Sequence, residues 1–202
     1  MSGPSKRAEG DPGRVPDRPV GGQAPRGPQR SGPRPGGPDR PRKRGGPPTR
    51  RPGQKPGSIG LARAGGNDFE LVHPRGVKEM ELDYEEGLEL WKAGDPESAR
   101  DALRYALAAC HDNLWIHTAL GRIALEEFHD PSLAQGHFGY AVELGLQALP
   151  RNFAGRLSSD RPSNRPFFEA VEGLLRCLEA LGRHEDFRHL RSTRDRLLAG
   201  AS

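Results

Sequence analysis

Apolar residues recur at the spacing of amphipathic helices through most of the C-terminal two thirds of this chain. Between residues 75 and 198 they return every three or four positions, and polar or glycine-rich connections separate the successive stretches. This period places the apolar side chains on one face of a helix. The pattern predicts six helices, at about 75–93, 96–110, 114–128, 131–149, 166–182 and 184–198.

Residues that start or stop helices stand at the boundaries of these stretches. Gly94 supplies a position where a positive φ lets the first helix end, and Pro96 follows where its missing N–H costs nothing. The pair Asp95-Pro96 returns as Asp130-Pro131. Side-chain oxygens can accept hydrogen bonds from the free N–H groups of a first turn. The expected N-cap residues are Asp95, Asn113, Asp130 and Asn164.

Three glycines interrupt the fourth predicted helix. Gly136, Gly139 and Gly145 each disfavour the helix by about 1 kcal/mol relative to alanine. Close approach of a neighbouring helix would compensate for this cost. We therefore expect these glycines to lie at a helix contact.

Residues 150–165 separate the fourth and fifth helices and contain no helical stripe. Loops of this length are uncommon inside a compact domain and are often functional. We expect an ordered inserted loop, packed into the domain by Phe153 and Leu157.

A repeat of 34 residues relates the first two helix pairs. Gly87 and Gly121 are 34 positions apart, and the spacing Ala99-x3-Leu103-x2-Ala106 returns as Ala134-x3-Phe138-x2-Ala141. Period and pattern resemble the tetratricopeptide repeat. Short runs, among them HFGY at 137–140 and FFEAVEGLLRCLEALG, look like those of uncharacterised bacterial tetratricopeptide proteins. The resemblance implies an all-α domain over residues 68–202, with about three stacked antiparallel hairpins at 75–110, 114–149 and 166–198.

The third hairpin matches this repeat least well. Leu175 stands where the repeat has glycine, and Phe187 stands where it has alanine. The first repeat also departs from the pattern, because Asp83 replaces its tryptophan. Two true repeats followed by an unrelated helical pair are therefore an alternative arrangement.

Residues 1–66 differ sharply from this helical part. They hold 14 of the 20 prolines and 16 of the 27 glycines, and 15 Lys and Arg against 4 Asp and Glu, a net charge of +11. The remaining 16 basic and 23 acidic residues give residues 67–202 a net charge of −7. Few large apolar residues are present to offset the entropy cost of folding. We expect residues 1–67 to form a disordered basic tail with local polyproline II character.

Two functions are open for this tail. It would serve as a solubilising segment or linker, or it would bind a polyanion such as nucleic acid. Aromatic residues that could stack on bases are absent from it, which weakens a base-specific reading. The candidate polyanion-binding residues are Arg40, Arg42, Lys43, Arg44, Arg50 and Arg51.

The resemblance also implies a ligand site. In tetratricopeptide proteins, ligands usually bind a concave groove lined by the first helix of each hairpin. That geometry implies that Arg122 and Arg176 hold matching places and could bind a ligand carboxylate, the alternative being two solvated surface arginines. The implied groove residues are Tyr84, Leu88, Trp91, Trp115, Thr118, Arg122, Glu126, Glu172 and Arg176. Glu81 would adjoin them.

The sequence contains no pattern that indicates catalysis, a metal or a cofactor. Cys110 and Cys177 each precede a histidine by seven positions, but zinc sites normally use close pairs of ligands. Both cysteines fall on apolar faces, where a small hydrophobic residue is expected. The phosphate-binding motifs G-x4-GK[ST] and G-x-G-x2-G are both absent from the sequence. We expect a non-enzymatic protein with no metal or cofactor.

No secretory signal or apolar run of membrane-spanning length is evident, so the expected location is cytoplasmic. The first functional hypothesis is an interaction scaffold that binds a protein segment. The second is a nucleic-acid- or ribosome-associated protein that uses the basic tail. A third is a homodimer formed through the repeats.

Overall fold

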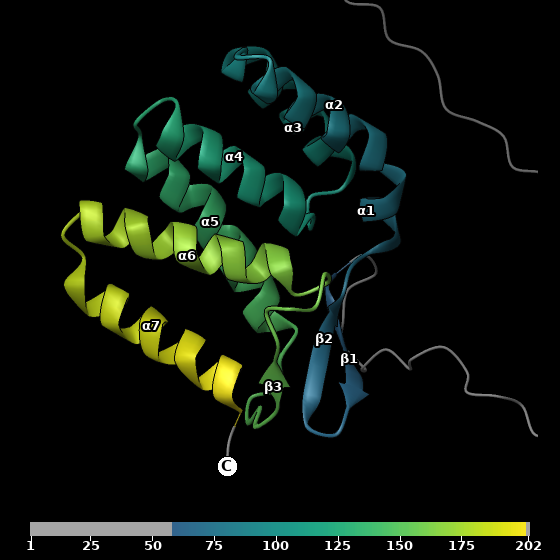
Figure 1. Ribbon diagram of the computed structural model, residues 1–202, viewed down its shortest axis with the longest axis vertical. Coiled ribbons are helices and arrows are strands. Elements are labelled where there is room, and N and C mark those ends of the chain that lie inside the picture. Colours follow the sequence, from purple (N-terminus) through teal and green to yellow (C-terminus); the bar gives the residue numbers. More distant parts are fainter. Residues whose placement is uncertain (1–57, 201–202) are drawn as a thin grey trace, which may run out of the picture. The chain divides into compact units, whose positions relative to one another are not determined.

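The computed structural model describes residues 58–200, a mostly helical region with a small three-stranded sheet. A helix is present at each of the six predicted places (Figure 1). The elements in chain order are β1 (Gly60–Gly65), β2 (Asp68–Val72), α1 (Arg75–Glu79), α2 (Glu81–Lys92), α3 (Pro96–Ala109), α4 (Leu114–Glu126), α5 (Pro131–Gln147), β3 (Arg156–Leu157), α6 (Arg165–Ala180) and α7 (His184–Ala199).

The six long helices pack as consecutive pairs. Helix α2 contacts α3, α4 contacts α5, and α6 contacts α7, while α3–α4 and α5–α6 contacts join one pair to the next (Figure 1). Helix α4 also packs along α6, whereas α2 touches α4 only sparsely. The first pair is therefore more loosely joined to the second pair on the α2 side, and this difference leaves room for the groove described below.

The first predicted helix, 75–93, is broken into α1 and α2 at Met80. The ψ of Met80 is 14°, outside the helical range. Helix α1 lies against the end of α3, where a Cβ at Gly76 would be 3.2 Å from the Cys110 Sγ atom. The break thus allows α1 to leave the axis of α2 and pack on Cys110, which is buried, as is Cys177.

Three of the four expected N-caps are confirmed. The Asp95 carboxylate accepts a hydrogen bond from the backbone N–H of Ser98, and the Asp130 carboxylate accepts one from Leu133. The Asn113 side chain accepts hydrogen bonds from the backbone N–H groups of Trp115 and Ile116, in the first turn of α4. Gly94 has a φ of +85°, the conformation expected of the residue that ends α2.

The prediction of an all-α fold is confirmed only in part, because the described residues are mostly helical but also form a small three-stranded sheet. Strands β1 and β2 form an antiparallel hairpin in which Gly60 pairs with Val72, and β3 adds a parallel strand through the pairing of Phe69 with Leu157. Order thus begins within the segment assigned to the tail. The rest of the predicted tail, residues 1–57, lies outside the described residues, so its predicted disorder stays a prediction.

The loop between α5 and α6 is ordered and packed, as expected. Leu157 is fully buried, and the ring of Phe153 meets that of Phe69 edge to face with centroids 5.2 Å apart. The Arg156 guanidinium lies 3.4 Å from the carboxylate of Asp68. This loop supplies β3 and thereby connects the sheet to the helices.

Asn164 stands at the N-cap position of α6, as predicted, but its side chain makes no capping hydrogen bond. Its side chain is fully buried and accepts a 2.8 Å hydrogen bond from the Leu71 N–H. It also donates to the carbonyl oxygens of Phe69 and Ser158, at 3.1 and 2.9 Å. One side chain therefore joins β2, the 150–165 loop and the start of α6.

Phe138 of α5 occupies the centre of the larger hydrophobic core. Its ring is 1% exposed and lies between two glycines, Gly121 of α4 and Gly173 of α6. A Cβ atom at either position would come within 2.7 Å of the ring. The glycines thus allow three helices to meet around a single aromatic ring.

The three glycines inside α5 differ in surroundings. Only Gly145 lies at a helix contact, where an added Cβ would be 2.2 Å from the Phe167 ring. Open space surrounds Gly136 and Gly139, so the expected close helix contact is wrong for these two.

Replacing Gly136 by alanine should therefore raise the free energy of unfolding by about 0.5–1 kcal/mol, because alanine reduces the backbone entropy lost on folding. Gly145→Ala should lower it by about 1–3 kcal/mol through overpacking. Equilibrium unfolding in urea measures both changes. An unchanged midpoint for Gly145→Ala would contradict the close approach of α5 and α6.

Candidate functional site

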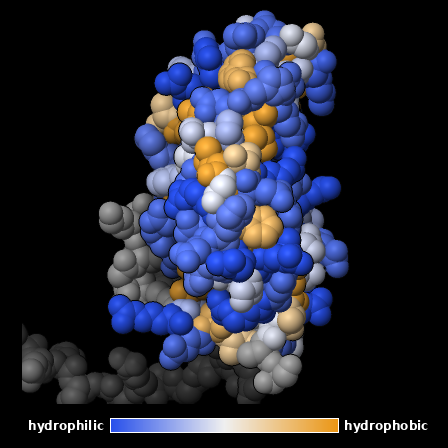
Figure 2. All heavy atoms as spheres, turned by 90° about the vertical axis from the view of Figure 1, so that its left-hand side faces the viewer, coloured by the Kyte–Doolittle hydropathy of each residue, from blue (hydrophilic) through white to orange (hydrophobic). Residues whose placement is uncertain are grey.

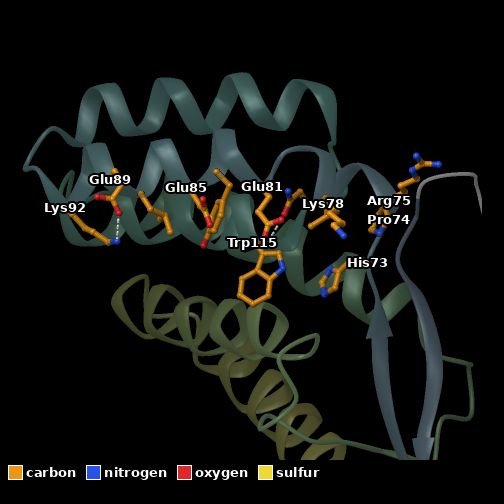
Figure 3. Close-up of a pocket in the computed structure, with 13 residues that line it drawn as sticks. His73, Pro74, Arg75, Lys78, Glu81, Glu85, Glu89, Lys92 and Trp115 are labelled. Atoms are coloured by element: carbon orange, nitrogen blue, oxygen red, sulfur yellow. Dashed lines mark hydrogen bonds and ion pairs between the residues drawn. The ribbon is translucent and has the colours of Figure 1, made fainter.

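A groove of about 1060 Å³ runs beside α2 and is bordered by the β2–α1 junction and the start of α4 (Figure 3). Tyr84, Leu88 and Trp115, which the resemblance placed in a groove, are among its lining residues. The complete lining is His73, Pro74, Arg75, Val77, Lys78, Glu81, Tyr84, Glu85, Leu88, Glu89, Lys92, Asn113 and Trp115.

One face of α2 forms the long wall of the groove. Tyr84 and Leu88 are half-buried. They pack against a second, smaller hydrophobic core that buried residues of α3 and α4 form. Burial raises the pKa of the Tyr84 hydroxyl, and the charge of Glu169 raises it further against the opposing effect of Arg122. The Tyr84 hydroxyl is therefore protonated at neutral pH, so it can donate as well as accept a hydrogen bond.

Trp115 and His73 form the opposite side. The Asn113 cap fixes the first turn of α4, which carries Trp115, and the indole ring lies below α2 in Figure 3. The His73 ring is tilted against this indole with centroids 6.2 Å apart, and its Nε2 donates to the Ser163 carbonyl oxygen at 2.7 Å. Burial lowers the pKa of His73, which favours the neutral ring at neutral pH.

Charged groups border the apolar part of the groove, which Tyr84, Leu88 and Trp115 line. Glu81, Glu85 and Glu89 follow each other at four-residue intervals along α2 (Figure 3). Lys92 neutralises Glu89 at 2.7 Å. Within residues 58–200, neither Glu81 nor Glu85 forms an ion pair, and Lys78 forms none either. Two glutamates therefore remain available to a basic ligand.

A smaller hollow of about 280 Å³ adjoins the groove and is lined by Leu88, Trp91, Lys92 and Arg122. The Trp91 Nε1 donates to the Glu127 carboxylate at 2.8 Å. The Arg122 guanidinium lies 4.8 Å from the centre of the Trp91 ring, which is a cation–π distance. Glu127 and Arg122 therefore hold the Trp91 side chain in place.

Arg122 and Arg176 are brought together, but around a carboxylate of this chain. Arg122 lies 3.3 Å from Glu126, and Arg176 lies 3.9 Å from the same side chain. Neither arginine lines the larger groove. Glu172 forms a 2.8 Å ion pair with Arg194 of α7.

Thr118 is not a groove residue, contrary to the prediction. It is 3% exposed, and its hydroxyl donates to the carbonyl oxygen of Pro166 at 3.1 Å. Its place between α4 and the start of α6 follows from the close packing of these two helices, which the resemblance did not specify. The six predicted polyanion-binding residues of the tail lie outside the described residues.

Sequence reasoning missed several residues that line the groove. Glu85 and Glu89 could have been found from the four-residue interval that begins at Glu81. No local signal indicated His73, Pro74 and Asn113, because they reach the groove only when β2 turns into α1 and α3 into α4.

A pair of histidines lies apart from the groove, between α4 and α5. The Nδ1 atoms of His117 and His137 are 3.4 Å apart. His117 Nε2 donates to the carbonyl oxygen of His111 at 3.0 Å, so its Nδ1 can only accept, and His137 supplies the proton. Burial, His117 and Arg104 together lower the pKa of His137 to about 4. Burial also lowers the pKa of His117.

This pair should make the domain sensitive to acid. The folded-state pKa of His137 lies below the ordinary value of 6.5, so the unfolded chain takes up protons first. Stability conferred by the neutral ring is present above pH 6.5 and is lost as the pH falls towards 4, by roughly 2–3 kcal/mol. Urea unfolding at several pH values measures this loss. His137→Asn should show a shallower decline, and superimposable pH profiles would contradict the assignment.

No helix within residues 58–200 is long and apolar enough to cross a membrane. No group of three or more His, Cys, Asp or Glu side chains in that region is arranged to hold a metal ion. Comparisons of the chain with family models, with curated proteins and with solved structures find no match.

Proposed function

We propose that this chain is a non-enzymatic interaction scaffold whose groove binds an extended protein segment carrying basic side chains. The observation that carries this proposal is the combination of an aromatic floor with two exposed glutamates, Glu81 and Glu85, that have no ion-pair partner within the described region. Buried apolar and aromatic side chains in a groove give affinity, while charges at its border select the ligand.

The groove suits an extended chain better than a compact small molecule. Its volume of about 1060 Å³ is at the upper end of small-molecule sites, and it is an elongated, open feature along α2 (Figure 3). On the face shown in Figure 2, hydrophobic residues form only small, separate patches on a hydrophilic surface. The groove is therefore a stronger candidate for binding than that face.

The arrangement of the helices supports a tetratricopeptide-like form of this proposal. Helices α2, α4 and α6 are the first members of their pairs, and α4 packs along α6. Tyr84, Leu88 and Trp115, expected to face a ligand, line one groove. In this proposal α2 and α4 present the ligand surface, and α3 and α5 support it from behind.

Selection of peptides from a random library, with the full chain as target, tests the groove. We expect the selected peptides to be rich in Arg, Lys, Pro and apolar residues. Trp115→Ala and Tyr84→Ala should each weaken binding about tenfold or more, because truncating a central aromatic residue commonly costs 1–2 kcal/mol or more.

Tyr105→Ala is a matched control for this experiment, because Tyr105 lies on α3, is 77% exposed and does not line the groove. Its affinity for the peptides should equal that of the wild type. Peptides that bind the Tyr84, Trp115 and Tyr105 variants equally well would contradict the proposal.

A polyanion-binding role remains the alternative function, and the charge asymmetry of the sequence favours it. Residues 1–66 carry 15 basic and 4 acidic residues, whereas residues 67–202 carry 16 basic and 23 acidic residues. Removing the tail should abolish binding of a nucleic acid and spare a groove ligand. The reverse result would exclude the alternative.

A further inference from the structure

The described region of the chain begins at one end of the groove. Gly60, near the start of the described region, pairs with Val72 at the end of β2. The next two residues of the chain, His73 and Pro74, line the groove. Gly60, and with it the point where the chain enters the described region, therefore lies beside the groove.

The segment that comes directly before this entry has the chemistry of a groove ligand. Residues 45–57 read GGPPTRRPGQKPG and contain four prolines, three basic residues and no acidic residue. Proline-rich segments favour the extended polyproline II conformation, and this conformation docks into aromatic-lined grooves. The arginines Arg50 and Arg51 can pair with carboxylates.

We propose that residues 45–57 occupy the groove as an internal ligand, with Arg50 and Arg51 against Glu81 and Glu85. This inference rests on the proposed function of the groove. Eight residues in a polyproline II conformation span about 25 Å, so Arg50 can reach well along α2, whose twelve residues span about 18 Å. The prolines then lie against Trp115 and Tyr84.

Tethering makes this contact effective although its ion pairs are individually weak. Exposed ion pairs contribute at most about 1 kcal/mol each, but a short tether supplies an effective concentration in the millimolar range. An outside ligand must therefore displace the segment. Salt, or a polyanion that binds the arginines, weakens the internal contact and opens the groove.

The two tryptophans of the chain allow a direct test by NMR of the full chain. One indole, Trp115, lies in the groove, and the other, Trp91, donates to Glu127 outside it. The double variant Arg50→Glu, Arg51→Glu should shift the Trp115 indole N–H signal and leave the Trp91 signal in place.

The reciprocal variant Glu81→Lys, Glu85→Lys should shift the Trp115 signal in the same way. Combining all four changes restores the charge match and should return the signal towards its wild-type position. Glu86→Lys is a control on the same helix, because Glu86 does not line the groove and its substitution makes the same charge change as each single Glu→Lys step of the double variant. If the Trp115 signal of the quadruple variant lies as far from its wild-type position as that of either double variant, the proposed ion pairing is overturned.

A peptide of residues 45–57 added to the full chain tests occupancy. It should bind the chain with Arg50→Glu and Arg51→Glu about tenfold more tightly than wild type, because the wild-type groove is already filled. Equal binding to both chains, or binding of library peptides but not of this one, would overturn the inference and leave the proposed function standing. No groove binding by any peptide would overturn both.

Discussion

Replacing Phe138 by alanine is expected to lower the free energy of unfolding by about 3–5 kcal/mol, which exceeds a third of the stability of many domains. The ring is 1% exposed and fills the space between Gly121 and Gly173. Neither glycine has a side chain that could move into the resulting cavity. The cost should therefore lie at the upper end of the range for large-to-small substitutions.

Urea unfolding of the full chain, followed by far-UV circular dichroism, measures this loss. Leu133→Ala is the control, because Leu133 lies on the same helix and is 44% exposed. It should cost less than about 1 kcal/mol. A similar cost for the two variants would mean that α4, α5 and α6 do not meet around Phe138.

Replacing Asn164 by leucine is expected to cost about 3–5 kcal/mol as well. The substitution leaves the Leu71 N–H and the carbonyl oxygens of Phe69 and Ser158 without their partner in a buried site. Each unsatisfied buried group costs about 1–3 kcal/mol. The sheet should separate from the helices before the helices unfold.

Amide hydrogen exchange resolves these two steps. In the Asn164→Leu variant, protection should fall first at the amides of β1 and β2. Asn152→Leu is a control in the same loop, because Asn152 is exposed. Unchanged protection of the Leu71 amide in the Asn164 variant would show that the sheet does not depend on this side chain.

The helices of this domain follow from local sequence, and so do most of their ends. The three- and four-residue spacing of apolar positions, the Asp95 and Asp130 caps and the turn at Gly94 act within one or two helical turns. Their effect does not depend on the rest of the fold. This is why six helices could be located from the sequence.

The hairpin of β1 and β2 was missed although a weak signal was present. Ile59 and Leu61 alternate with small residues, Phe69 and Leu71 alternate with acidic ones, and glycines stand between the two runs. The composition of the tail outweighed this signal. Burial of Ile59 and Leu71 and the pairing with β3 stabilise the strands, and both require residues about 90 positions away.

The candidate site was only partly predictable, because part of it also depends on contacts between residues far apart in the sequence. Tyr84, Leu88 and Trp115 were expected because helix periodicity and the repeat resemblance define one face of each helix. That Thr118 is buried under α6, and that Glu172 pairs with Arg194, depends on how the helix pairs pack. Periodicity predicts which face of a helix is apolar, but it does not predict which other helix packs against that face.

The sequence by itself thus determined the helices, their caps and the division of charge between a basic tail and an acidic domain. The tertiary structure decided where the sheet forms, that Asn164 bridges strand and helix, and that β2 delivers His73 to the groove. The physical reason is the range of the interactions. Helix periodicity and capping act between residues up to four positions apart, whereas strand pairing and groove formation join distant segments whose contacts exist only after the chain has folded.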